Sequence, residues 1–210
     1  MIFKSLSHWE RDWGEGTIGA QRSFPKDRAR SEPDCPHLTA LSTTQTHRAS
    51  THVHSVLRIA DIDNALIEAL LTRHGLSLVR VADGEGIPGS FWGDDEAGII
   101  GNTVYVRSDT PVHSLLHEAG HLIVLPPERR EEVHTDATDS IEEEDAVCYL
   151  QIVLGDTLPG VGRQRIMSDM DAWGYSFRLG SAHAWFEQDA ENARDWLVAR
   201  GLLTRDGEPV

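Results

Sequence analysis

The segment Pro111–Leu125, PVHSLLHEAGHLIVL, decides how the rest of the chain is interpreted. Proline suits the first turn of a helix, and the two prolines that follow Leu125 end one. The segment therefore predicts a helix over about 111–125. Within it His117 and His121 are four residues apart, so both imidazoles should lie on the same helix face.

The five residues HEAGH at 117–121 match the zinc-binding pattern HExxH. Two imidazoles one turn apart can bind one zinc ion at about 2.0–2.1 Å. Glu118, at the edge of that face, can take a proton from a zinc-bound water. The chain contains 11 histidines, so coincidence is the alternative. The apolar flanks favour the metal, since a buried polar group without a partner is costly. We therefore predict His117 and His121 as zinc ligands and Glu118 as the catalytic base.

The third zinc ligand is expected in the acidic run 142–145, EEED, which opens a second predicted helix over about 141–154. The face of Glu143 should point inward because it is an apolar stripe of Ala146, Val147, Leu150 and Leu154. The face of Glu144 is less apolar and holds Val147, Cys148, Gln151 and Gly155. Glu143 is therefore the predicted ligand, with the neighbouring acids as alternatives. Ser140 and Glu143 also match a capping box, which is a purely structural explanation.

With these motifs in place, the chain resembles gluzincin-type zinc metallopeptidases, and among them small cytoplasmic enzymes such as the ImmA/IrrE-type repressor-cleaving peptidases. The resemblance covers about residues 100–155. It rests on HEAGH followed, 22 residues after His121, by Glu143-x-x-Ala146. In that family the third ligand is a Glu followed by x-x-Ala and often Asn, so the resemblance also assigns this role to Glu143. Val147 stands where Asn is common.

The resemblance implies a site that cleaves a protein or peptide substrate held in extended form by an edge strand. The β-branched and aromatic run 103–107, TVYVR, predicts such a strand before the helix. Thr103, Val104 and Tyr105 are therefore candidate substrate-binding residues. The alternative is an ordinary core strand.

Further histidines and tyrosines could line the site. Tyr175 and His183 are candidate stabilisers of the transition state, because a phenol or an imidazole can donate to an oxyanion. His113 lies one turn before His117, where a surface or supporting role is expected. His134 lies in a polar linker and could reach the metal.

The expected fold class is α+β, with a small sheet packed beside a helical core that carries the HExxH helix. A helix closing at Gly75 and a strand over 76–82 should precede a glycine-rich loop over 83–98. Beyond the acidic helix we expect a helix near 163–172 and a long helix from about 182 to 200.

The charge divides the chain into two parts. Residues 1–55 hold 7 Lys and Arg against 6 Asp and Glu, whereas residues 56–210 hold 12 against 28. The first part is polar and aperiodic and is predicted to be a disordered or weakly structured leader. Residues 56–210 are predicted to form the metallopeptidase-like domain. The net charge of −15 argues against a nucleic-acid partner.

Two cysteines, Cys35 and Cys148, do not suggest a disulfide framework. No stretch approaches the ~20 apolar residues that cross a bilayer, and the start lacks the apolar core of a secretory signal. A cytoplasmic protein without a membrane partner is expected. The leading interpretation is a zinc-dependent peptidase. The alternative is a catalytically inactive metal-binding regulatory or interaction protein with a peptidase-like fold, whose metal site would be closed by four protein ligands.

Overall fold

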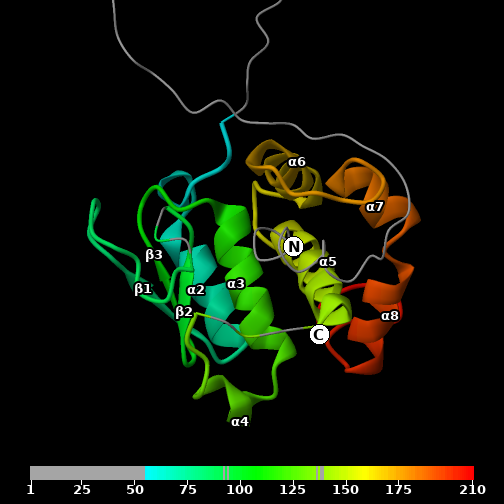
Figure 1. Ribbon diagram of the computed structural model, residues 1–210, viewed down its shortest axis with the longest axis horizontal. Helices are drawn as coiled ribbons and strands as arrows, with labels where there is room; N and C mark the ends of the chain where they lie inside the picture. Colours follow the sequence, from blue (N-terminus) through cyan, green and yellow to red (C-terminus); the bar gives the residue numbers. More distant parts are fainter. Residues whose placement is uncertain (1–54, 92, 94, 136, 138–139) are drawn as a thin grey trace, which may run out of the picture. The chain divides into compact units, whose positions relative to one another are not determined.

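The structure is a computed structural model that describes residues 55–91, 93, 95–135, 137 and 140–210. The leader predicted over 1–55 lies outside these residues, apart from Ser55. The described residues form seven α-helices and a three-stranded mixed sheet, which confirms the predicted α+β class (Figure 1). None of the helices among the described residues has the length and apolar character needed to cross a lipid bilayer.

The first α-helix, α2 (Asn64–Arg73), ends just before Gly75, where the sequence predicted its end. The Asp63 carboxylate accepts a hydrogen bond from the Ala65 amide at 2.9 Å and caps the helix start. Gly75 follows the helix end with φ of +73°, a conformation that glycine adopts at little steric cost. A short 3₁₀ turn, η1 (Ile59–Asp61), precedes this helix.

The sheet has the order β1-β3-β2, formed by Ser77–Arg80, Thr103–Val106 and Gly98–Ile100 respectively. Strand β3 pairs in parallel with β1 and antiparallel with β2. The prediction that Thr103, Val104 and Tyr105 form an edge strand is therefore wrong, because β3 is the central strand and both of its sides are hydrogen-bonded. The reason is that Gly98–Ile100 pairs with the second side of β3 as a strand, although the sequence pattern assigned Gly98 to a loop and predicted no strand there.

Glycine at position 98 makes this pairing possible. A Cβ on Gly98 would collide with the carbonyl oxygen of Pro88 and the amide nitrogen of Ser90, so the chain folds back closely only without a side chain. The outer side of β2 is also engaged, since the Ile99 carbonyl accepts from the Thr135 amide at 3.0 Å. The strand that lacks an outer neighbour in the described part of the chain is β1.

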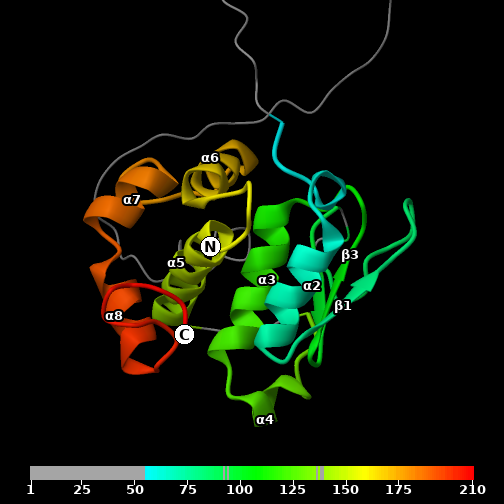
Figure 2. The same ribbon diagram turned by 180° about the vertical axis from the view of Figure 1, so that it is seen from behind.

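Two central helices carry the candidate site. Helix α3 (Val112–Val124) lies between the sheet and α5 (Ile141–Asp156), and both views show this order (Figures 1 and 2). The short α4 (Pro127–Arg130) follows α3. The buried Arg130 guanidinium donates to the carbonyl oxygens of Leu125 at 3.4 Å and His74 at 2.9 Å. This one side chain therefore ties the chain after α3 to the end of α2.

The C-terminal helices are α6 (Arg163–Trp173), α7 (Ala182–Gln188) and α8 (Glu191–Ala199). Of these, α7 and α8 lie on the side of α5 away from α3, whereas α6 packs against both α5 and α3 (Figures 1 and 2). The single helix predicted over 182–200 is thus two helices, which meet at Asp189-Ala190. Asp189 leaves the helical conformation with φ of −143°, and its carboxylate accepts from Arg178 Nε at 2.8 Å. This contact with a residue outside the helix is not visible in the local sequence pattern.

Candidate metal centre

Helix α3 brings the two predicted histidines together. The side chains of His117 and His121 are buried, and their rings lie 4.6 Å apart at 86° to each other. Their Nε2 atoms are 3.0 Å apart. The four-residue spacing has therefore placed both nitrogens at one point on the helix face, as the sequence predicted.

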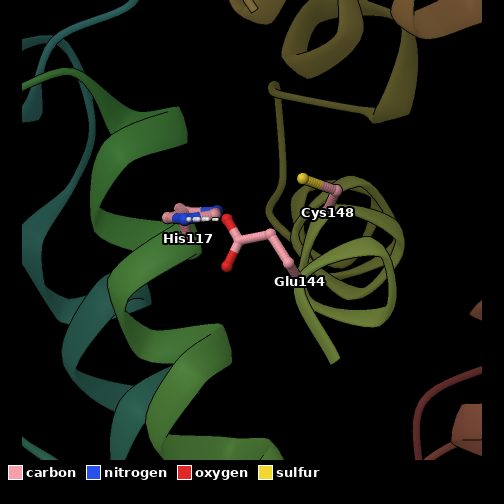
Figure 3. Close-up of side chains that lie close together, drawn as sticks. All are labelled: His117, Glu144 and Cys148. Atoms are coloured by element: carbon pink, nitrogen blue, oxygen red, sulfur yellow. Dashed lines mark ion pairs between the residues drawn. The ribbon is translucent and has the colours of Figure 1, made fainter. Parts of the chain in front are cut away.

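The carboxylate beside these nitrogens comes from α5 and belongs to Glu144 (Figure 3). Glu144 Oε1 lies 3.3 Å from His117 Nε2, and Oε2 lies 3.6 Å from His121 Nε2. Glu143, the acid that the sequence favoured, does not occupy this position. Its backbone amide instead donates to Ser140 Oγ at 3.2 Å, so Ser140 caps the start of α5. That half of the predicted capping box is confirmed.

The choice of Glu143 failed because α5 is buried on every side. All residues from Ala146 to Gly155 are buried, so an apolar stripe does not mark the side that faces α3. The polar side chains of Glu144, Cys148 and Gln151 mark it instead. Close approach of the two helices depends on Gly120, where an added Cβ would lie 3.0 Å from Val147 Cγ1.

Cys148 joins the cluster one turn after Glu144. One ligand atom from each of His117, Glu144 and Cys148 lies within 4.8 Å of the other two (Figure 3). The sequence interpretation did not include Cys148 as a site residue. The signal that could have found it is the i, i+4 spacing of Glu144 and Cys148, which is the same spacing as that of the two histidines.

The charges of the cluster are strongly coupled. Burial alone would raise the pKa of Glu144, but its hydrogen bond to His117 and the nearby imidazole charges hold that pKa below its usual range. Burial alone would lower the pKa of His117, but its hydrogen bonds with Cys148 and Glu144 outweigh burial and raise that pKa to about 10. In the ion-free protein the centre is therefore an ion pair of His117 and Glu144.

The donor atoms fit a zinc ion. Two ligands of a tetrahedral zinc ion, each about 2.0–2.1 Å from the metal, are about 3.3–3.4 Å apart. The three observed separations are 3.0, 3.3 and 3.6 Å. Two imidazoles and one carboxylate are also a donor set that zinc accepts. His117, His121 and Glu144 could therefore hold the ion without rearrangement of the helices.

The remaining predicted residues lie at different distances from this centre. Glu118 is half-buried on α3, next to His117 in the chain. Tyr175 is buried, and its ring is edge-on to that of His117 with centroids 6.2 Å apart. Its hydroxyl is within 3.4 Å of both Gln151 Nε2 and His113 Nδ1. The Tyr175 hydroxyl thus pairs with buried side chains, Gln151 and His113, rather than with a ligand atom of the candidate centre. His183 is exposed on α7.

The structure also shows where His113 and His134 lie relative to the candidate centre. His113 is fully buried rather than on the surface, and its ring contacts Trp173 and Tyr175. Burial, followed by the charge of His117, lowers the pKa of His113 to about 3, so its ring is neutral. His134 is exposed, and its Nδ1 pairs with its neighbour Thr135 at 2.8 Å. His134 is therefore not brought to the metal centre.

No protein-family model matches this chain, and no curated protein and no solved structure gives a match. What can be said of its function therefore depends on the geometry of the centre.

Proposed function

We propose that this protein is a zinc-dependent hydrolase, a metallopeptidase in which His117, His121 and Glu144 hold the ion and Glu118 is the general base. The observation that carries the proposal is the meeting of two imidazole nitrogens and one carboxylate group from two helices, with the nitrogens 3.0 Å apart and each of them 3.3 or 3.6 Å from one carboxylate oxygen. Three protein ligands leave a position for substrate, which distinguishes catalytic zinc sites from structural ones.

The catalytic roles follow from the chemistry of the side chains. Zinc, when bound, polarises the scissile carbonyl group and lowers the pKa of an attacking water towards ~7. The Glu118 carboxylate accepts the proton of that water on one of its oxygens and passes it to the nitrogen of the leaving amine. Glu118 suits this role because it is next to a ligand in the chain and is only half-buried.

The resemblance to gluzincin-type peptidases is part of this proposal, with one change. The arrangement of an HExxH helix and a Glu on a second helix is retained. The carboxylate in the ligand position is one residue later than the Glu-x-x-Ala pattern requires, since Glu144 is followed at the corresponding place by Val147. The subgroup of ImmA/IrrE-type enzymes thus has less support than the broader class. A protein or peptide remains the proposed substrate, and a reducing compartment such as the cytoplasm suits the Cys148 thiol.

The test compares metal content with hydrolysis of an unfolded protein such as casein. The purified chain should contain about one zinc ion per molecule, and Glu118→Gln should keep this zinc while its hydrolytic rate falls by about 10²–10⁴. His117→Ala should lose both. The matched control is Glu142→Gln, which changes an exposed acid on α5. Equal zinc content in the unchanged chain and His117→Ala would rule out the proposed centre.

A second candidate function is favoured by Cys148. If its sulfur is a fourth ligand, the site is closed, and the protein is a catalytically inactive metal-binding regulatory or interaction protein. The sulfur lies within 4.8 Å of the donor atoms of His117 and Glu144, which is near enough for a side-chain rotation to bring it to the ion.

Cobalt substitution separates the two candidates. A thiolate bound to Co²⁺ gives an intense near-ultraviolet absorption band, whereas nitrogen and oxygen ligands do not. The hydrolase proposal expects no such band, and Cys148→Ser should retain bound zinc and hydrolysis. A band that disappears in Cys148→Ser, in a chain without hydrolytic activity, would favour the closed site.

A further inference from the structure

Gln151 lies on the opposite side of the His117 ring from Glu144. His117 faces the carboxylate with Nε2, and its other nitrogen, Nδ1, is 3.0 Å from Gln151 Oε1. Gln151 is completely buried on α5, so water does not compete for this contact. A buried amide with fixed partners can therefore control how the imidazole is presented to the metal.

The backbone of α3 sets the orientation of this amide. Gln151 Nε2 is 3.3 Å from the carbonyl oxygen of His113 and 3.4 Å from the hydroxyl of Tyr175. A backbone carbonyl oxygen can only accept a hydrogen bond, so the NH₂ end of the amide must face His113. The oxygen end then faces His117, and the amide cannot turn over without placing two oxygens against each other.

The orientation of the amide determines where His117 carries its hydrogen. An amide oxygen can only accept, so the nitrogen that faces it must donate. We propose that Gln151 is a positioning residue which, oriented by the carbonyl group of His113, keeps a hydrogen on His117 Nδ1 and leaves Nε2 as the metal-binding nitrogen. This inference rests on the proposed role of His117 as a metal ligand, but its first test needs no metal.

Tyr175 completes the network. Its hydroxyl oxygen accepts the second amide hydrogen of Gln151, so its own hydrogen can point to His113 Nδ1, 3.4 Å away. The neutral His113 ring accepts there. The chain of contacts therefore runs from His113 Nδ1 through the Tyr175 hydroxyl and the Gln151 amide to His117 Nδ1, and each of these contacts has a defined donor and acceptor.

The test uses the full-length, metal-free chain with ¹⁵N-labelled histidine. The Nδ1–H group of His117, which the protonated ring of the metal-free chain carries, should give a slowly exchanging imidazole proton signal in the ¹⁵N–¹H spectrum, because Gln151 Oε1 accepts its hydrogen bond in the buried interior. Gln151→Met, which removes both polar ends at similar size, should make this proton exchange too fast to give the signal and weaken zinc binding by about 10–100-fold. Gln164→Met is the control, since it makes the same change at an exposed position on α6 and should alter neither readout.

Gln151→Glu provides the rescue. With its carboxyl group protonated, one oxygen accepts from His117 Nδ1 and the hydroxyl donates to the His113 carbonyl oxygen, so the imidazole signal should persist and zinc should bind within a few-fold of the unchanged chain. A folded Gln151→Met variant that keeps the signal or the zinc affinity would overturn the inference. So would a Gln151→Glu variant that loses both. If the signal behaves as expected and the chain neither retains zinc nor hydrolyses protein, the proposed function fails while the amide's control of His117 stands.

Discussion

Helices α3 and α5 are both central, and each supplies side chains to the candidate metal centre, but the residues are arranged differently along the two helices. On α3 the functional residues form a compact motif, and His117 and His121 lie where their spacing predicts. On α5 the functional residues are spread over Glu144, Cys148 and Gln151 among buried apolar residues. Both helices are buried almost all round, so apolar side chains do not mark the face that carries the cluster on either helix, and the polar side chains mark it instead.

The largest effect on zinc affinity should come from replacing one of the two adjacent acids of α5, Glu144, rather than the other, Glu143. Glu144→Gln should weaken zinc binding by more than about a hundredfold, because losing a ligand costs more than losing a residue that supports one. Glu143→Gln should change the affinity less than about threefold, by the same reasoning. The measurement is competition with a chromophoric chelator. A larger loss in Glu143→Gln would return the third-ligand role to that residue.

The next largest effect should be a loss of stability when a methyl group is added to the closely packed contacts of α5. A Cβ at Gly155 would collide with Ile166 Cγ1 on α6, so Gly155→Ala should lower the free energy of unfolding by about 1–3 kcal/mol. Gly120→Ala on α3 should cost less, because its nearest contact is a Val147 methyl group at 3.0 Å. Alanine also favours a helix interior by about 1 kcal/mol over glycine. Urea unfolding of both variants measures the difference, and a more harmful Gly120→Ala would contradict this ranking.

Zinc affinity should depend on pH because the ion replaces a proton. Against the effect of burial, hydrogen bonds with Cys148 and Glu144 raise the pKa of His117 to about 10, so its ring is protonated at neutral pH in the ion-free protein. Zinc must displace that proton, and binding should therefore tighten as the pH rises, by about tenfold per pH unit for each proton released. Titration calorimetry in two buffers of different ionisation enthalpy would count the protons. An affinity that is constant between about pH 6 and 8 would contradict this coupling.

The smallest effect should come from the start of α5. Ser140 caps this helix by accepting from the Glu143 amide, and Ser140→Ala should cost about 1 kcal/mol of unfolding free energy. Helix α3 has no such side-chain cap, because Pro111 occupies that position. Thermal unfolding measures the change, with Ser168→Ala at an exposed position in the middle of α6 as the control. No difference between the two variants would show that the cap is dispensable.

Local patterns predicted most of the fold. The terminating Gly75 and the paired prolines after α3 act on their immediate neighbours, so they mark helix ends without knowledge of the rest of the chain. Strand β2 was not predicted, because its three residues are too few to show the alternation that marks a strand, and it is held by pairing with β3. The break between α7 and α8 was missed for a similar reason, since Asp189 is paired with a residue outside the helix.

The sequence by itself determined the helix ends and the two histidines one turn apart, because these depend on interactions over only a few residues. Only the tertiary structure decided which acid lies beside those histidines, that Cys148 is next to them, and that Gln151 contacts the Nδ1 atom of His117. These outcomes depend on the rotation of α5 about its axis, and that rotation is set by packing against α3, α6 and α8 rather than by any pattern within α5 itself.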